Sequence, residues 1–378
     1  MHRPLARTVR FGILSTFPPA ACGLASFSSS LAAALCAQGS EVGVVRIADG
    51  SPSSDGRVVG ELVNGSSASS DACVAELNQR EVAVVQHDYD LYGGAHGDEL
   101  LTILGGLQVP SMVVVHSVLK EPAPHQRWVL EQIASLADRV VVMSEVARER
   151  LSREYAVDLR KIVVIPHGAS LPTQPRLKRA SRPLILTCGL LGPGKGVERV
   201  IDVMPALMSV GGRPRYLVAG QTHPRVLARE GETYREARIE QARSLGVADS
   251  VSFDDRYIDR ASLTALIQSA AVIVLPYDST DQVTSGVLVD AVASGRPVVA
   301  TAFPHAVELL RGGAGIIVPH DDPDALTAGL RRVLTQPRLA GAMAAEARQL
   351  ASAMAWPVVA NTYVQEAAQL LLQKRTGD

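Results

Sequence analysis

The sequence predicts an α/β protein of two domains, each a parallel sheet covered by helices on both faces. Short apolar runs of strand length alternate with helical patterns along most of the chain, which is typical of doubly wound parallel sheets. A proline-rich segment near the middle separates two such series. The length of 378 residues fits two domains of about 170–190 residues each, so both can bury a full core.

The first series predicts a domain at residues 1–170. Strands are expected at 9–15, 41–47, 82–86, 111–115, 139–143 and 162–165, with helices at 26–37, 97–107, 126–137 and 145–155. Residues 49–71 are rich in Ser, Gly and Asp, and they interrupt this alternation. They are predicted to form a surface loop.

Residues 171–183 are expected to link the domains, because prolines and basic residues alternate there. The second domain, 184–356, has predicted strands at 184–188, 215–219, 250–253, 271–275, 297–301 and 315–318, and a long helical tail from Pro323. Trp356–Pro357 interrupts this tail, and a new helix is expected from Val358 to about Gln373. The break predicts that residues 357–378 return in part to the first domain.

The composition excludes several classes of protein. A net charge of −1 with 20% charged residues gives no overall field for a polyanion, so no nucleic-acid partner is expected. The four cysteines show neither a CxxC pair nor a metal-ligand spacing, which predicts reduced thiols, a cytoplasmic location and no metal site. No stretch approaches the ~18 apolar residues of a membrane span, and the basic start leads straight into a strand rather than a secretory signal.

The stretch at 276–301, PYDSTDQVTSGVLVDAVASGRPVVAT, predicts a strand end, a loop, a helix beginning near Thr284 and a second strand. Ser285 and Gly286 would open this helix with free N–H groups, which attract an anion. Asp290 lies about two turns after Gln282, near the carboxyl ends of the strands, where a carboxylate is able to accept two hydroxyls. The alternative is an ordinary crossover helix whose Asp290 faces water.

A second loop of the same domain, CGLLGPGKGVE at 188–198, places Lys195 among glycines between a strand and a helix. A lysine with exposed amides at a helix start suits a diphosphate. The loop is not a P-loop, because Val197 stands where that motif needs Ser or Thr. The alternative is a solvated loop lysine.

In the first domain, polar residues follow three predicted strands. The turn STFPPAACG at 15–23 brings the backbone of Gly23 to the start of a helix, where a ligand is able to approach closely. His87, followed by Tyr89, and His116 end two further strands, and histidine serves as acid, base or hydrogen-bond donor near neutral pH. The alternatives are a plain turn and two satisfied core histidines, and no third ligand is spaced for zinc.

Asp254–Tyr257, DDRY, follows a strand of the second domain. Arg256 and Tyr257 would frame a nucleotide base. A polar turn with no ligand explains these residues equally well.

Together these features resemble the GT-B glycosyltransferases, specifically the large retaining group called family 4. The resemblance covers nearly the whole chain, and its most specific parts are CGLLGPGKGVE, the 276–301 block and VVIPHG before the linker. It implies two Rossmann-like domains that face a cleft, with a C-terminal helix crossing back to the first domain.

The family typically carries two glutamates separated by seven residues in the 276–301 block, the first near the donor sugar and the second on the ribose. Gln282 and Asp290 match these positions. Gln282 keeps hydrogen bonding without the charge, and Asp290 keeps an acceptor on a shorter arm. Leu190 stands where the family often has an arginine, so Lys195 would hold the phosphates with backbone amides alone.

The resemblance also assigns roles to individual residues. It makes His116, beside the sugar, and Lys195 the catalytic residues. It places His87 and Tyr89 on the acceptor or sugar side and Arg256 and Tyr257 at the base. The implied donor contacts are Gly23, Gly194, Gln282, Ser285, Gly286, Val287 and Asp290.

The implied activity is that of a metal-independent, retaining hexosyltransferase. A UDP- or GDP-sugar would be its substrate, no cofactor is needed, and the acceptor would be a glycan, a lipid or a small molecule; a lipid implies peripheral contact with a membrane. A second hypothesis is a nucleotide-sugar-binding protein with no or altered activity, because both glutamate positions differ. A Rossmann oxidoreductase is disfavoured, because GxGxxG is absent.

Overall fold

The computed structural model describes residues 8–172 and 182–376. The chain divides into two compact units, one of Met1–Gly168 with Trp356–Asp378 and the other of Ala169–Ala355. Most of the segment expected to link them, at 173–181, lies outside the described residues. Each unit contains a parallel sheet with helices, so the predicted α/β class is confirmed.

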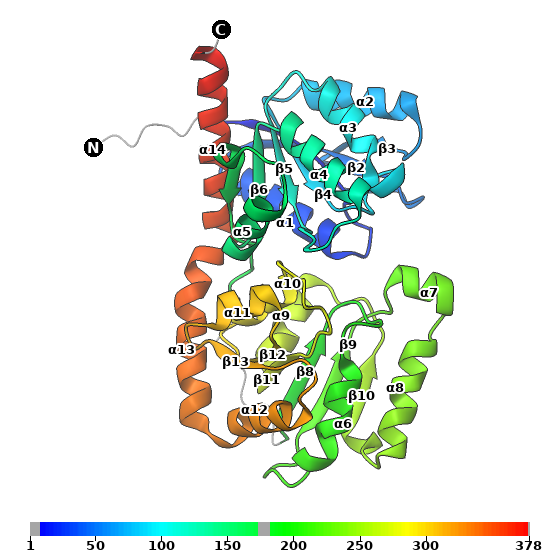
Figure 1. Ribbon diagram of the computed structural model, residues 1–378, viewed down its shortest axis with the longest axis vertical. Coiled ribbons are helices and arrows are strands. Elements are labelled where there is room, and N and C mark those ends of the chain that lie inside the picture. Colours follow the sequence, from blue (N-terminus) through cyan, green and yellow to red (C-terminus); the bar gives the residue numbers. More distant parts are fainter. Residues whose placement is uncertain (1–7, 173–181, 377–378) are drawn as a thin grey trace, which may run out of the picture. The chain divides into compact units, whose positions relative to one another are not determined.

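The described residues of the first unit form a seven-stranded parallel sheet in the order β3-β2-β1-β4-β5-β6-β7 (Figure 1). The strands are β1 (Arg10–Ser15), β2 (Glu41–Ile47), β3 (Val58–Leu62), β4 (Val82–His87), β5 (Ser111–Val115), β6 (Arg139–Val142) and β7 (Ile162–Val164). The helices are α1 (Gly23–Ala37), α2 (Ser67–Asn78), α3 (Glu99–Gly106), α4 (Pro124–Leu136) and α5 (Glu145–Glu154), with short 3₁₀ turns at Ala95–Gly97 and Leu159–Lys161.

The prediction of a surface loop at 49–71 is wrong, because this segment contains strand β3 and the start of helix α2. Within the described part of the chain, strand β3 pairs with β2 alone, and its residues alternate between partly buried and exposed up to the buried Leu62, so it lacks the continuous apolar run of a central strand. Ser66 accepts a hydrogen bond from the Ser69 N–H and caps α2, so serine here starts a helix rather than a loop.

The last helix, α14 (Trp356–Thr376), packs on α1 and completes the core of the first unit (Figure 1). Its buried face is formed by Trp356, Val359, Ala360, Tyr363, Ala367 and Leu370. A side chain on Gly168 would collide with Trp356, since its Cβ would lie 2.3 Å from Cε3 of the indole. The helix begins two residues before the predicted Val358, with Pro357 in its first turn, where proline is tolerated.

The second unit contains a six-stranded parallel sheet among its described residues, in the order β10-β9-β8-β11-β12-β13. The strands are β8 (Leu184–Cys188), β9 (Arg215–Ala219), β10 (Val251–Asp254), β11 (Val272–Leu275), β12 (Val298–Thr301) and β13 (Gly315–Val318). The helices are α6 (Val197–Leu207), α7 (Pro224–Glu230), α8 (Thr233–Ser244), α9 (Arg260–Ser269), α10 (Gly286–Ala293), α11 (Pro304–Leu310), α12 (Pro323–Thr335) and α13 (Pro337–Met354), with a 3₁₀ turn at Ala248–Ser250.

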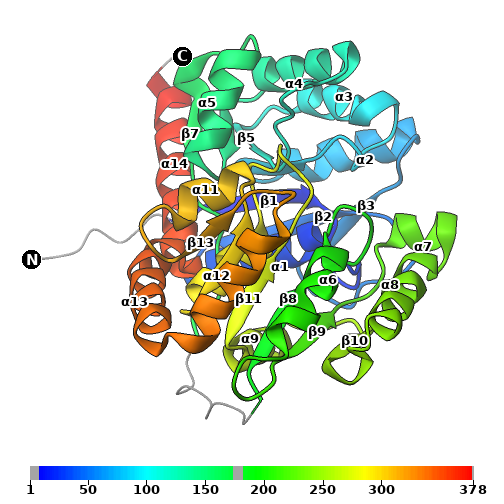
Figure 2. The same cartoon turned by 60° about the horizontal axis from the view of Figure 1, so that its bottom comes forward.

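Alternate residues of these strands serve two cores, one on each face of the sheet. Leu184 and Leu186 pack with helices α9, α10, α11 and the end of α13, whereas Ile185 between them packs with α6, α8 and α12. Figure 2 shows α6 and α12 in front of this sheet. The second sheet is therefore doubly wound, as its continuous apolar strands predicted.

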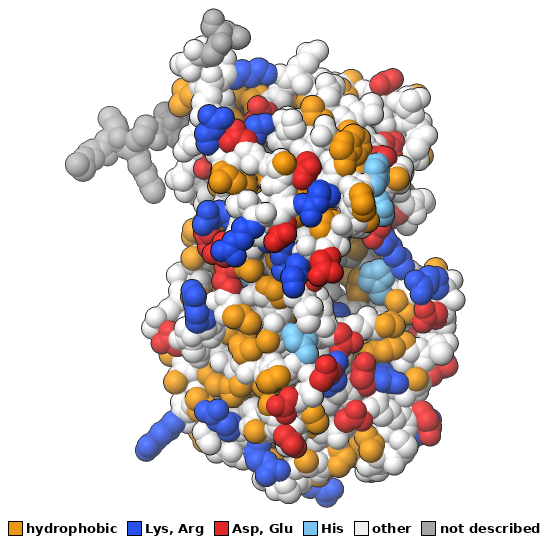
Figure 3. Space-filling model, viewed as in Figure 1, with side chains coloured by type: hydrophobic (Ala, Val, Ile, Leu, Met, Phe, Trp, Pro, Cys, Tyr) orange, Lys and Arg blue, Asp and Glu red, His pale blue; other side chains and the backbone are white. Residues whose placement is uncertain are grey.

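The surface carries both signs of charge, and the face seen in Figure 3 shows Lys and Arg intermingled with Asp and Glu. The four cysteines, all within the described residues, form no disulfide. None of the helices described here is both long and apolar enough to span a bilayer.

Candidate functional site

The order of the second sheet directs attention to the gap between β8 and β11. Chain connections run outward in opposite directions from these two neighbouring strands. The loops that follow them, at 189–196 and 276–285, therefore start side by side at the carboxyl edge. Open α/β sheets bind their ligands at this point.

Lys195 lies at the end of the first of these loops and contacts Tyr277 in the second. Its ammonium group lies 4.5 Å from the centre of the tyrosine ring and 3.4 Å from the hydroxyl oxygen. Tyr277 is buried, stacks on Phe303 at 5.1 Å and has its carbonyl held by the Thr301 hydroxyl at 2.7 Å. Lys195 thus packs on a fixed aromatic ring, and sequence reasoning missed Tyr277 although it stands two residues after the buried strand β11.

The ammonium group of Lys195 and the first turn of α10 converge over the backbone of Gly189. A Cβ placed on Gly189 would lie 3.5 Å from Lys195 Nζ and 3.4 Å from Val287 Cγ2. Gly189 has φ +108°, a conformation that favours glycine, so no side chain fills this space. A cation and a helix N-terminus therefore flank one small region beside bare backbone.

Helix α10 begins at Gly286, two residues after the predicted Thr284, and Ser285 is its cap. The Ser285 hydroxyl accepts from the Leu288 N–H at 3.3 Å. The Ser285 N–H is not free as predicted, because it donates to Nδ1 of the buried His305 at 2.9 Å. The anion-binding amides at this end are therefore reduced to those of Gly286 and Val287.

His305 was missed by sequence reasoning, although it stands in the first turn of α11, four residues after the end of the buried strand β12. Its own N–H donates to the Gln282 carbonyl at 3.2 Å, so the residue holds the turn before α10 at two points. An Nδ1 that accepts a hydrogen bond must be unprotonated. His305 is therefore neutral when this turn is in place.

Gln282 and Asp290 occupy different environments on and before α10. The Gln282 side-chain amide donates to the Thr284 carbonyl at 2.9 Å. Burial raises the pKa of Asp290 to about 6, and the positive charge of Arg260 opposes this rise. Burial lowers the pKa of Arg260, on α9, and the charges of Asp290 and Tyr257 act against that change.

The glycines around Lys195 have separate structural roles. Gly196 has φ +65°, and a Cβ there would lie 1.7 Å from the Pro276 carbonyl oxygen. Only glycine therefore lets α6 start against the second loop. Gly194 has open space around it and accepts a hydrogen bond from the Asp278 N–H at 3.0 Å.

The residues predicted at the base lie after β10. Arg256 is exposed and forms a fork with Asp254, with Nε 2.9 Å and Nη2 2.7 Å from the two carboxylate oxygens. Tyr257 is 52% exposed, so its ring is available for stacking.

In the first unit the sheet order reverses between β1 and β4, and the predicted residues follow these strands and β5. Gly23 is the exposed first residue of α1, behind the Cys22 cap, and nothing lies within 4 Å of where its Cβ would be. The His116 N–H donates to the His87 carbonyl at 3.0 Å, which brings the two histidines together as predicted.

These histidines differ in exposure but share a neutral charge state. His87 is fully buried, and within the described residues neither ring nitrogen has a hydrogen-bond partner. Burial lowers the pKa of His87 and that of His116 to about 4. His116 is half-buried, its Nε2 lies 2.7 Å from Gln86 Oε1, and its ring stands edge-on to Phe27 at 5.1 Å.

Tyr89 is almost fully buried, and its ring lies edge-on to His87 at 5.2 Å. Burial raises the pKa of its hydroxyl, and the neighbouring Tyr155 adds to this effect. Among residues 8–172 and 182–376, no group of three or more His, Cys, Asp or Glu side chains is arranged to hold a metal ion.

The topology of the two sheets defines the class of protein, which is an α/β protein with two Rossmann-type sheets. Both sheets contain the 3-2-1-4-5-6 strand order, and β7 extends the first sheet by one strand. The family follows from comparison with known sequences. A family model described as Glycosyl transferases group 1 matches residues 182–336, and one described as Glycosyltransferase Family 4 matches residues 22–171. The chain belongs to this group 1, family 4 type of glycosyltransferase.

Solved structures agree with this assignment at the level of the fold, and the predicted GT-B class is confirmed. A glycosyltransferase from Rickettsia africae ESF-5 has a TM-score of 0.74 with 15% identity, covering 96% of this chain and 99% of its own. Sucrose-phosphate synthase from Thermosynechococcus elongatus has a TM-score of 0.73 with 18% identity, covering 97% and 100%. Anabaena Alr3699/HepE, crystallised with UDP and glucose, has a TM-score of 0.71 with 15% identity, covering 96% and 100%.

Two curated relatives carry the name D-inositol 3-phosphate glycosyltransferase. The protein of Segniliparus rotundus is 30% identical over 190 residues, which are 47% of this chain and 40% of the relative. That of Actinosynnema mirum is 28% identical over 249 residues, which are 62% of this chain and 58% of the relative. The chain thus matches about half the length of these relatives.

Proposed function

We propose that this protein transfers a hexose from a nucleoside-diphosphate sugar to an acceptor, with retention at the anomeric carbon and without a metal ion. The observation that carries the proposal is the convergence of Lys195 Nζ and the first turn of α10 over Gly189. A cation, two helix N–H groups and bare backbone form a place for a diphosphate. The family assignment supports the same conclusion.

In the proposed reaction the bond between the anomeric carbon and the β-phosphate oxygen breaks, and negative charge develops on the departing diphosphate. Lys195 and the amides of Gly286 and Val287 would stabilise that charge. The β-phosphate oxygen then accepts the proton of the acceptor hydroxyl as its oxygen bonds to the same face of the sugar. This step needs no other base.

The nucleoside would bind near Asp290 and Tyr257, next to the diphosphate. Asp290 would accept hydrogen bonds from the ribose hydroxyls, and Tyr257 would stack on the base, while Arg256 stays paired with Asp254. The cation of Arg260 beside Asp290 favours the ionised carboxylate that this role needs.

The first unit would supply the sugar and acceptor contacts. Gln86 accepts only through its Oε1, so the proton of the neutral His116 lies on Nε2. Nδ1 then remains to accept a hydrogen bond from a sugar hydroxyl. His87 and Tyr89 lie behind His116, and Gly23 would let the diphosphate approach the start of α1.

The acceptor is a glycan, a lipid or a small molecule, and the names of the two curated relatives make D-inositol 3-phosphate the first compound to test. A cytoplasmic location is proposed, where nucleotide sugars are made. A lipid acceptor would add peripheral contact with the membrane.

The test is thermal unfolding with UDP, GDP, ADP and their glucose and mannose esters, in the presence of a metal chelator. A ligand that binds only the folded protein raises the Tm by mass action. The wild type should respond to one base, and Lys195→Ala should lose the response, whereas Arg243→Ala, on the exposed side of α8, should keep it. Donor-dependent release of the nucleoside diphosphate, followed by proton NMR of the product's anomeric signal, then tests transfer and retention. No response to any nucleotide would contradict the proposal.

A second candidate is a nucleotide-sugar-binding protein without turnover. It is favoured by Gln282, whose side-chain amide carries no charge and donates one N–H to the Thr284 carbonyl. This candidate predicts a Tm shift without sugar transfer to any acceptor in the panel. Transfer by the purified chain would eliminate it.

A further inference from the structure

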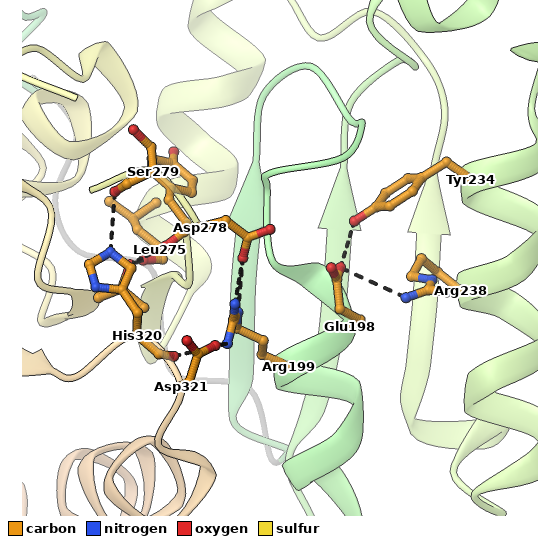
Figure 4. Close-up of polar contacts among 11 residues, drawn as sticks. Glu198, Arg199, Tyr234, Arg238, Leu275, Asp278, Ser279, His320 and Asp321 are labelled. Carbon is orange, nitrogen blue, oxygen red and sulfur yellow. Dashed lines mark hydrogen bonds and ion pairs between the residues drawn. The ribbon is translucent and has the colours of Figure 1, made fainter. Parts of the chain in front are cut away.

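The loop that leads into α10, residues 276–285, is held by the side chains of Arg199 and His320 (Figure 4). These side chains come from α6 and from the segment after β13. They contact Asp278 and Ser279, which stand between Tyr277 and the turn before α10.

Arg199 makes the larger part of this attachment. Its Nε and Nη2 lie 2.9 Å and 2.8 Å from Oδ1 of Asp278. Its Nη1 donates to the His320 carbonyl at 2.9 Å and to the Asp321 carboxylate. All three guanidinium nitrogens thus have protein oxygens as partners, which suits a structural link rather than a phosphate ligand.

His320 makes the second attachment. Its Nε2 lies 3.2 Å from the Ser279 carbonyl oxygen, which only accepts, so Nε2 carries the proton. The segment after β13 therefore bonds to Arg199 through the His320 carbonyl and to the loop through the His320 ring.

Helix α6 gives this attachment a firm base. Lys195 directly precedes the first residues of α6, and Arg199 follows it by one turn. Glu198, next to Arg199, points the opposite way and accepts from the Tyr234 hydroxyl of α8 at 2.6 Å (Figure 4). The Asp278 N–H also donates to the Gly194 carbonyl, and Lys195 contacts the Tyr277 hydroxyl, so the Lys195 loop and the 276–285 loop are joined directly at two points.

We propose that Arg199 is a positioning residue that fixes the 276–285 loop against the Lys195 loop before the nucleotide sugar binds. This inference rests on the proposed function and names a residue that the site itself does not contain. Ordering a loop costs conformational entropy, and a loop already ordered by Arg199 spares the donor that cost. The benefit appears in donor binding and not in the chemical step.

The two carboxylates bound by Arg199 differ in solvent exposure and therefore in how much each ion pair contributes. The Arg199 side chain is 27% exposed, Asp278 40% and Asp321 84%. An ion pair with a side chain as exposed as Asp321 contributes little. The link to Asp278 is therefore the one that matters, and Asp321 offers a matched control on the same guanidinium.

The experiment compares Arg199→Met, Arg199→Lys and Asp278→Ala with the control Asp321→Asn in the full chain. Three kinds of measurement are made: calorimetry gives the Kd for UDP and for GDP, steady-state kinetics gives the donor KM and kcat, and hydrogen exchange is followed in peptides covering 276–285. Lysine keeps the charge but makes one contact instead of a fork. It should therefore rescue only part of the loss.

Arg199→Met and Asp278→Ala should each raise the donor KM and the nucleotide Kd about tenfold with kcat within about twofold, because uniform binding is lost. Exchange should become faster in 276–285 but not in the strands, and the double variant should be no worse than either single one. Asp321→Asn should behave as the wild type. Hydrogen exchange needs no activity, so it also tests a variant that is poorly active.

If the wild type turns over donor and Arg199→Met shows an unchanged donor KM and unchanged exchange of the 276–285 loop, the inference about Arg199 is overturned while the proposed function stands. A fall in kcat at constant KM would also overturn it, because Arg199 would then act on the transition state. If the wild type neither binds nor turns over any of the nucleotides, the proposed function fails instead.

Discussion

The buried His87 makes the first unit sensitive to acid. Burial lowers the pKa of His87 from 6.5 to about 4, and the neighbouring His116 acts in the same direction while Asp88 opposes it. Between pH 6.5 and 4 the unfolded chain therefore binds more protons at this residue than the folded chain does. With respect to His87, the free energy of unfolding has its full value above pH 6.5 and decreases as the pH is lowered through this window.

The size of the effect follows from the two pKa values. Their difference, at about 1.4 kcal/mol per unit, limits the loss to about 3 kcal/mol, and at pH 5 the loss is about 2 kcal/mol. His87 has no exposed surface and no hydrogen-bond partner within the described part of the chain. Solvent therefore screens little of this cost.

The assay is urea unfolding followed by tryptophan fluorescence at pH 5 and pH 7.5. The sequence has 2 tryptophans, Trp128 and Trp356, and both lie in the first unit, so the signal reports on that unit. His87→Gln replaces the imidazole with an uncharged group of similar volume. It should lose about 2 kcal/mol less than the wild type between the two pH values.

His116→Gln is the companion variant, and it should also relieve part of the pH dependence, because burial lowers the pKa of His116 to about 4 as well. Above pH 7 all variants should show parallel, flat profiles. A wild-type stability that is equal at pH 5 and pH 7.5, or a His87→Gln profile with the wild-type slope, would refute the reasoning.

Three further predictions concern the second unit. Nucleotide affinity should fall as the pH drops through about 6, because burial raises the pKa of Asp290 to that value and the protonated acid has no charge. Calorimetry at pH 7.5 and pH 5 should show this fall in the wild type but not in Asp290→Asn. Gly196→Ala should lower the free energy of unfolding in urea by more than about 2 kcal/mol, because its φ is left-handed and the new Cβ collides with backbone. The control Gly211→Ala, with open space around it, should change this free energy by at most about 0.5 kcal/mol, and equal losses in the two variants would contradict the prediction. His305→Leu removes the acceptor for the Ser285 N–H and should weaken nucleotide binding about tenfold, whereas His305→Asn, which offers an oxygen, should retain most of it; equal affinities for the two variants would count against the link.

The central strands were predictable because both of their faces are buried. Strands such as β5 and β8 have the predicted bounds, since a continuous apolar run leaves no other place for them than a covered sheet. The edge strand β3 was missed for the opposite reason. Its exposed half and its glycine look like a loop in the sequence, and only pairing with β2 orders them.

The candidate site was predictable where its residues follow strands directly. Lys195 and Ser285 stand at the ends of glycine-rich or polar loops after apolar runs, and Asp290 lies on the helix that follows Ser285; the sheet order brings the two loops together. Arg199 and His305 were not predictable, because their roles depend on partners far away in the sequence. Asp278 lies 79 residues from Arg199, and Ser285 lies 20 residues before His305.

The return of α14 to the first unit has a consequence for synthesis on the ribosome. The first unit needs Trp356 and the helix after it to close its core, whereas the second unit is a continuous segment, Ala169–Ala355. As the chain emerges, the second unit can therefore complete its fold before the first, although it is made later. Until Trp356–Thr376 leaves the exit tunnel, the apolar face of α1 around Phe27 has no α14 to cover it, so the first unit cannot close its core.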